Sequence, residues 1–173
     1  MSLRLARSAT LTVNSEITMG TCTTTLLDDN NKQSTTVAFG DVYISELVAK
    51  SKIKKFKIRF SGCAGIPDKS AKVKLSPRIA GCAGTAFANK SSNNPATNAA
   101  VEVWTTDTPD KNGSTQFNCS TTNTLTAPLD TATVNTPYDY PLSARMVVAN
   151  NGQASTVSPG DFYSPATFTI TYQ

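Results

Sequence analysis

The sequence contains no histidine. Histidine is the commonest general base, proton shuttle and metal ligand in proteins, so the chain lacks the residue that many hydrolases and metal centres use. It also lacks a G-x-S-x-G elbow, a clustered pair of acids and a glycine-rich phosphate loop. These absences indicate a protein that is not an enzyme and that binds no cofactor and no metal ion.

The four cysteines form no C-x-x-C pair, which argues against a zinc site. Separated cysteines in a threonine-rich chain indicate instead two disulfides and an oxidising compartment. These residues are Cys22, Cys63, Cys82 and Cys119. Their spacing alone leaves the pairing open.

No apolar run approaches the roughly 18 residues of a membrane helix. Residues 1–7 carry charges and lack the apolar segment of a secretory signal. If the protein is exported, as the cysteines indicate, we expect this sequence to be its mature form, with a tag remnant in its first three residues. The basic residues within 50–59 have no interleaved aromatic side chain on their face, so we expect no nucleic acid as a partner and regard them as a solvated strand face.

The clearest pattern that is present lies in residues 9–22. Side chains at the odd positions of 9–19 are apolar or small, and those at the even positions are polar. Because the side-chain period of a strand is two, this segment is a strand with one face to bury. No hairpin turn before Cys22 gives it a partner. Its inward positions are Ala9, Leu11, Val13, Ser15, Ile17 and Met19.

Alternation and strand-forming residues predict further strands over 53–63, 71–75, 98–105, 138–149 and 166–172, with shorter ones at 22–27, 36–39 and near 86–88. Between them lie turns and polar stretches. The last strand alternates to the end of the sequence, so we expect its edge to need another strand. Seven or eight short strands indicate an all-β, immunoglobulin-like β-sandwich.

Together these features resemble the pilin subunits of chaperone–usher fimbriae, in particular the type 1 fimbrial family. The resemblance covers almost the whole chain. It rests on four stretches: the alternating strand that runs into Cys22, the stretch FKIRFSGC that ends at Cys63, the stretch NAAVEV from Asn98, and the C-terminal SPGDFYSPATFTITYQ with Gly160 and Tyr172.

In that family the domain is an immunoglobulin-like fold that lacks its last strand, which leaves an apolar groove beside the C-terminal strand. A periplasmic chaperone fills the groove first. At the outer-membrane usher, the N-terminal extension of the next subunit then replaces the chaperone strand, a form of β-augmentation. The resemblance therefore implies a structural subunit of an adhesive fimbria, of the shaft or adaptor kind. Such a subunit reaches the bacterial cell surface through the periplasm and contacts the chaperone, the usher and neighbouring subunits.

The resemblance also implies roles for single residues. Residues 1–20 would be the extension and residues 21–173 the pilin domain, with the inward residues of 9–19 as the donor strand. The acceptor groove and chaperone-binding strand would contain Gly160, Ala166, Phe168, Ile170 and Tyr172. Cys22 would pair with Cys63, and a bond between Cys82 and Cys119 would be extra to the family pattern. Ser15 stands where the family usually has glycine, at a tight spot of the partner's groove.

Two alternatives stay open. The N-terminal strand can fold back as an edge strand of its own domain, or it can swap with a second copy of the chain. The polar loops 77–100 and 106–128 can make the domain an adhesive, carbohydrate-binding subunit, although polar loops are usual on any sandwich. We expect the strand to be given to another subunit rather than kept.

Overall fold

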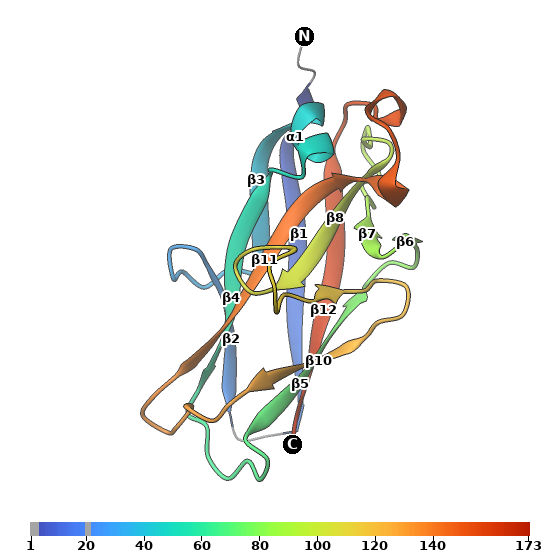
Figure 1. Cartoon of the computed structure of the whole chain (residues 1–173). Coiled ribbons are helices and arrows are strands. Elements are labelled where there is room, and N and C mark those ends of the chain that lie inside the picture. Colours follow the sequence, from blue (N-terminus) through green and yellow to red (C-terminus); the bar gives the residue numbers. More distant parts are fainter. Residues whose placement is uncertain (1–3, 20–21) are drawn as a thin grey trace.

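Two β-sheets packed face to face make up the fold (Figure 1). The computed structural model describes the backbone of residues 4–19 and 22–173, and the side chains of residues 9–15 and 22–173. Besides strands, this part of the chain holds helix α1 (Ile44–Ala49) and two 3-10 turns, η1 (Ala149–Asn151) and η2 (Ala154–Thr156). The predicted all-β sandwich is confirmed. Within the described ranges, no helix is long and apolar enough to cross a membrane.

Sheet one contains both ends of the chain. Its strands lie in the order β10 (Thr124–Pro128), β5 (Ser70–Pro77), β12 (Phe162–Tyr172), β1 (Arg4–Met19) and β3 (Thr36–Tyr43). Strand β12 is antiparallel to β5 but parallel to β1, and β1 is antiparallel to β3. The first and last strands therefore lie side by side, as the blue and red ribbons of Figure 1 show.

Sheet two contains the middle of the chain. Its strands lie in the order β2 (Thr23–Asp28), β4 (Ile53–Ser61), β11 (Tyr138–Val148), β8 (Ala99–Thr105), β7 (Ala86–Ala88) and β6 (Cys82–Ala83). The short strand β9 (Gln116–Phe117) pairs with β8. Within residues 77–100 and 106–128, which the sequence analysis treats mainly as loops, β7 lies at the short strand expected near residues 86–88, and β6, β9 and β10 are further short strands.

The inward faces of the strands fill the space between the two sheets. On β4, Phe56, Ile58 and Phe60 are at most 4% exposed, as their alternation predicts. Phe168 of β12 meets Phe56 and Phe117 from sheet two, with ring-centroid distances of 6.4 and 5.6 Å. Aromatic pairs at such distances add to the stability that burial provides. One aromatic cluster therefore joins the last strand to the opposite sheet.

Three basic side chains of β4, those of Lys55, Lys57 and Arg59, alternate with its buried residues, and each has an acidic partner. Lys55 Nζ lies 3.8 Å from Asp107 Oδ2. Lys57 Nζ and Arg59 Nε lie 3.2 and 2.7 Å from carboxylate oxygens of Asp139 on β11. The hydrogen bond from Arg59 holds the pKa of Asp139 below its ordinary value. These side chains remain partly exposed, so the cluster adds little stability. It does balance the like charges of the strand.

Two disulfides cross-link the chain. Cys22, directly before β2, is bonded to Cys63, which follows β4, and the two Cα atoms are 4.1 Å apart. Cys82 of β6 is bonded to Cys119, with Cα atoms 5.8 Å apart. The first disulfide fixes the start of β2, and the second ties together the short strands at the margin of sheet two.

We expect the double variant Cys82→Ala/Cys119→Ala to lose about 4 kcal/mol of stability, because the disulfide restricts the unfolded chain. The closed loop is long, with a sequence separation of 37 residues. Urea unfolding of both proteins under oxidising conditions measures the difference. A loss below about 1 kcal/mol would contradict the chain-entropy explanation.

Candidate functional site

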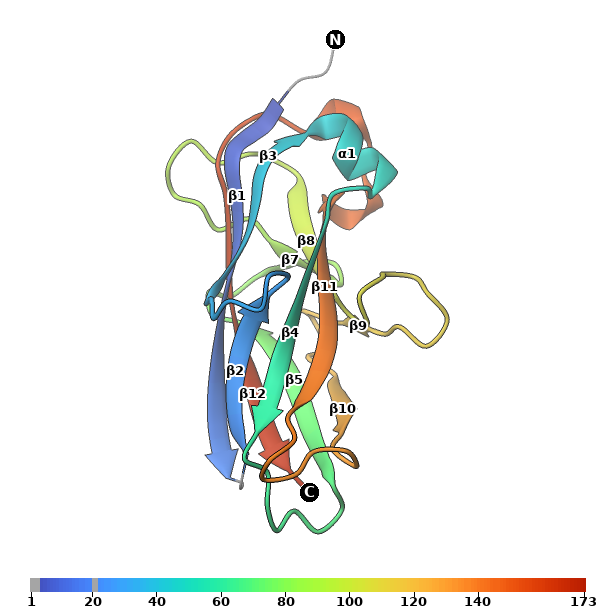
Figure 2. The same cartoon turned by 90° about the vertical axis from the view of Figure 1, so that its left-hand side faces the viewer.

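A slot for one strand lies in sheet one between β12 and β3, and β1 occupies it (Figures 1 and 2). β1 pairs with β12 along residues 9–19 and with β3 along residues 4–12. Neighbouring strands are about 4.8 Å apart, so without β1 the backbones of β12 and β3 would face each other across about 10 Å with unpaired groups. This slot is the candidate functional site.

The side chains that fill the slot are those that the alternation selects. Ala9, Leu11 and Val13 are at most 1% exposed, and Ala166 and Phe168 of β12 are fully buried beside them. The floor of the slot is thus the core of the domain itself. A strand that occupies this part of the slot must offer small or apolar side chains at the positions of Ala9, Leu11 and Val13.

Three predicted donor residues need separate comment. The side chains of Ile17 and Met19 lie outside the described residues, and their backbones pair with β12, with an irregularity between them. Ser15 is described and is exposed, although its neighbour Phe168 is buried. The chain's own slot therefore holds no tight pocket around Ser15. The tight spot expected in a partner's groove stays a prediction.

In the described ladders, β1 has a strand on both sides only along residues 9–12, and residues 4–8 pair with β3 alone. Its pairing with β3 ends at Thr12, opposite Thr36, and the next backbone contact is the hydrogen bond that Val13 N donates to Thr35 O at 2.8 Å. Beyond this point the described ladder joins residues 14–19 to β12 alone. A strand with one open edge unfolds locally at a lower free-energy cost. Residues 14–19 are therefore held less firmly than residues 9–12.

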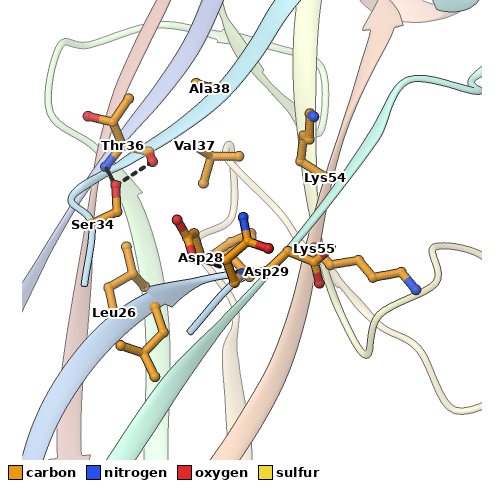
Figure 3. A pocket seen from close by; sticks show the side chains of 12 residues that line it. Leu26, Asp28, Asp29, Ser34, Thr36, Val37, Ala38, Lys54 and Lys55 are labelled. Atoms are coloured by element: carbon orange, nitrogen blue, oxygen red, sulfur yellow. Dashed lines mark hydrogen bonds between the residues drawn. The ribbon is translucent and has the colours of Figure 1, made fainter. Parts of the chain in front are cut away.

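A pocket of about 280 Å³ opens beside the start of β3, where the chain crosses from sheet two to sheet one (Figure 3). Val37 and Phe56 contribute apolar surface to it. At its rim, Asp28 Oδ1 accepts hydrogen bonds from the backbone N–H groups of Asn30 and Lys32 at 2.8 and 2.9 Å. Because this carboxylate holds the turn after β2, we interpret the pocket as a gap between the sheets rather than a ligand site.

The connection from β1 to β2 explains why β1 runs parallel to β12. Only two residues separate Met19 from Cys22 in the sequence. Cys22 lies beside the end of β12, since its carbonyl accepts a hydrogen bond of 3.5 Å from Tyr172 Oη. A chain covers at most about 3.5 Å per residue, so β1 must end where β12 ends. A strand that enters its own slot is therefore forced to be parallel.

Two predicted groove residues lie at or beyond the ends of β12. Tyr172 is its last residue; the ring meets Phe60 edge-on, and burial raises the pKa of the Tyr172 hydroxyl to about 12. Gly160 precedes β12 and touches another backbone segment: a Cβ there would lie 2.4 Å from Asn94 O and 2.5 Å from Ala96 N. Gly160 therefore permits the close approach of the chain that enters β12, whereas Ala166, Phe168 and Ile170 lie along the slot.

The second wall of the slot, β3, is missing from the residues that the sequence analysis assigns to the site. Val37, Phe39 and Val42 of this strand are buried, at 7%, 2% and 0% exposed. The alternation of residues 36–39 predicts a strand here. Alternation gives the buried face of a strand but not its neighbours, so it does not indicate that β3 and β12 share a gap.

Comparisons with known proteins agree with this architecture. Residues 10–173 match the family described as fimbrial protein. A protein of Escherichia coli K12, described as the uncharacterized fimbrial-like protein YadL, is 47% identical over 178 residues, which cover 99% of this chain and 88% of that protein. The crystal structure of the P pilus rod subunit PapA is similar with a TM-score of 0.58 and 15% identity, over 88% of this chain and 99% of that one. At this identity the likeness to PapA concerns the fold alone.

We expect Leu11→Ala to destabilise the domain by about 2–5 kcal/mol, because it removes a fully buried side chain from the slot. Thr12→Ala, one position along on the outward face, should change stability by less than about 0.5 kcal/mol. Urea unfolding of the two variants measures both effects. Equal effects would show that β1 is not seated in its own slot.

The two disulfides provide a matched test of the tether, since their sequence separations of 41 and 37 residues are similar. Loss of either should cost similar chain entropy. Only the loss of Cys22–Cys63 frees the end of β1. We therefore expect faster amide hydrogen exchange over residues 9–17 in Cys22→Ala/Cys63→Ala than in Cys82→Ala/Cys119→Ala, under conditions where both are folded. Equal rates would argue against the tether.

Proposed function

Since the chain belongs to the fimbrial protein family and is a subunit of chaperone–usher pili, we propose that it is a shaft or adaptor subunit that donates β1 to a neighbour. Residues 1–20 act as the donor extension in this proposal, and residues 21–173 form the pilin domain that accepts a strand. The observation that carries the proposal is the one-strand slot between β12 and β3.

The chain contains both the strand and the slot that would form a contact between two subunits. The slot buries every second side chain along residues 9–13, and the sequence of residues 9–19 alternates with this period. When one surface of a subunit fits a different surface of the next copy or relative, the contact is heterologous and builds open filaments. Backbone hydrogen bonds along the ladder supply affinity, and the inward side chains supply register.

The direction of β1 supports exchange between subunits. In its own slot β1 must run parallel to β12 because it is tethered to Cys22 by two residues. A strand from another chain has no such tether and is free to enter antiparallel to β12. Antiparallel pairing is slightly more stable per residue than parallel pairing. The part of β1 that pairs with β12 alone offers a place where exchange can begin.

The partners in this proposal are the neighbouring subunits, a periplasmic chaperone and the outer-membrane usher. The chaperone strand would occupy the slot along Ala166, Phe168 and Ile170 before the neighbour does. The subunit would pass through the periplasm to the fimbria on the cell surface, and the two disulfides suit that oxidising route. Two copies can also swap β1 reciprocally, because the strand and the slot are identical in both.

The second candidate function, an adhesive subunit that uses residues 77–100 and 106–128, has one observation in its favour. Residues 83–86 border a hollow on the outer face of sheet two. This hollow lies away from the slot, so adhesion and strand exchange are compatible in one subunit. Its chemistry is considered separately below.

A peptide with the sequence of residues 9–19 should raise the melting temperature of a chain that lacks residues 1–20. At a peptide concentration of 100 times Kd, mass action predicts a gain of about 2.7 kcal/mol. The matched variants are Val13→Asp and Asn14→Asp: both add one negative charge, but only Val13 is fully buried. Val13→Asp should abolish the gain, since an unpaired buried carboxylate is costly, whereas Asn14→Asp should keep it.

Equal stabilisation by both variant peptides would contradict insertion into the slot. In a reconstituted system with chaperone and usher, the chain that lacks residues 1–20 should still bind the chaperone but should not be passed on to another subunit. Fibres that contain this chain at internal positions would disprove the donor assignment.

A further inference from the structure

The outer face of sheet two holds a hollow of about 290 Å³ that is separate from the strand slot. Its lining comes from the hairpin of β6 and β7, from β8 and β11, and from the turn η1. Figure 1 shows β6 and β7 at the margin of sheet two. Val101 and Val103 of β8 belong to the core between the sheets, so Glu102 between them points to the opposite face. The hollow and the slot therefore lie on different sides of the molecule.

The floor of the hollow is apolar and made of small side chains. Ala83, Ala86 and Val147 line it and form a separate buried cluster with Ala100 and Ala149. Small side chains leave a nearly flat surface of methyl groups. Such a surface fits the C–H face of a ring that carries hydroxyl groups at its edge.

A buried carboxylate faces this hollow. Glu102 is 7% exposed and lines the hollow. Two hydrogen bonds end on its Oε2 atom, donated by Trp104 Nε1 at 2.9 Å and by Arg145 Nε. Among the described hydrogen bonds, none ends on the other oxygen, Oε1. Oε1 is not one of the buried side-chain atoms without a partner, so it is accessible, and Glu102 lines the hollow. Oε1 is therefore suited to accept a hydrogen bond from a ligand hydroxyl.

Two asparagines form the polar rim of the hollow. Asn150 and Asn151 have backbone φ angles of 54° and 53°, which asparagine tolerates better than most residues do. No hydrogen bond within the described ranges uses either side-chain amide. Asn150 Oδ1 stands over the β6–β7 turn, 3.2 Å from where a Cβ at Gly84 would lie. Each amide offers both donors and an acceptor to a ligand.

The charge around the hollow selects against anions. Arg145 is the cation beside Glu102, and its guanidinium also donates to Asp110 and lies 5.2 Å from the centroid of the Trp104 ring. One cation with two carboxylates leaves a net negative cluster. An anionic ligand such as an acidic sugar would therefore meet repulsion here, whereas a neutral sugar would not.

We propose that this hollow binds one neutral hexose ring, such as the end of a glycan. The C–H face of the sugar lies on Ala83, Ala86 and Val147, and its hydroxyls donate to Glu102 Oε1 and exchange hydrogen bonds with the rim amides. The volume is near the lower end of ordinary ligand pockets, about 300 Å³, which suits a single ring rather than a long oligosaccharide.

The test is an NMR titration of the ¹⁵N-labelled full chain with the methyl glycosides of glucose, galactose, mannose and N-acetylglucosamine. At least one glycoside should produce saturable shifts of the backbone amides of residues 84–86 and 149–152 with a Kd of about 1–10 mM. The variant Asn150→Gly/Asn151→Gly keeps the positive φ angles available and removes both amides. It should raise Kd about tenfold or more.

The matched control is Asn31→Gly, which removes an asparagine of φ 61° from the turn between β2 and β3 and should leave Kd unchanged. Absence of shifts up to about 50 mM with all four glycosides would overturn the proposal. Equal Kd values in wild type and double variant would overturn it too, as would tighter binding of N-acetylneuraminic acid or tetramethylammonium. The double variant should accept the residue 9–19 peptide normally when it lacks residues 1–20, so failure here is distinct from failure of strand exchange.

Discussion

The backbone of sheet one must be hydrogen-bonded on both sides of the gap between β12 and β3, and this requirement shapes the rest of the molecule. Unpaired N–H and C=O groups on two facing strands, above an open core, are costly and promote association. One strand satisfies both walls at once and covers the core with Leu11 and Val13. The domain is therefore complete only when some chain supplies this strand.

The anchor at Cys22 determines how the chain can supply the strand to itself. Because only two residues separate the end of β1 from this disulfide-bonded cysteine, β1 can enter its own slot in only one direction, parallel to β12. Self-insertion covers the core and so protects the free subunit from aggregation. It also leaves residues 14–19 with a strand on one side only. The tether thus lets β1 fill its own slot, but β1 is held there less firmly than a strand that is paired on both sides along its whole length.

Much of the fold could be predicted from period-two alternation, since this pattern selects Phe56, Ile58 and Phe60 for the core and places residues 9–19 in a strand with one buried face. The prediction that another subunit receives this strand concerns an assembly of several chains. In the single chain, the strand lies inside sheet one, between β12 and β3, and not at an edge. Alternation does not encode strand neighbours, so the role of β3 was not predictable. The close backbone approach at Gly160 also depends on residues far away in the sequence.

The outer face of sheet two carries a cluster of charged and aromatic side chains that takes no part in the strand slot. Glu102 and Trp104 on β8 lie beside Arg145 on β11, and the hydrogen bond from Arg145 to Glu102 joins positions 43 residues apart in the sequence, so no local pattern predicts it. Burying an arginine is tolerable only when carboxylates surround it, and here Asp110 provides the second one. Because this cluster stands on sheet two, exchange of a strand in sheet one leaves it unchanged. The two sheets therefore allow assembly and ligand recognition to vary independently.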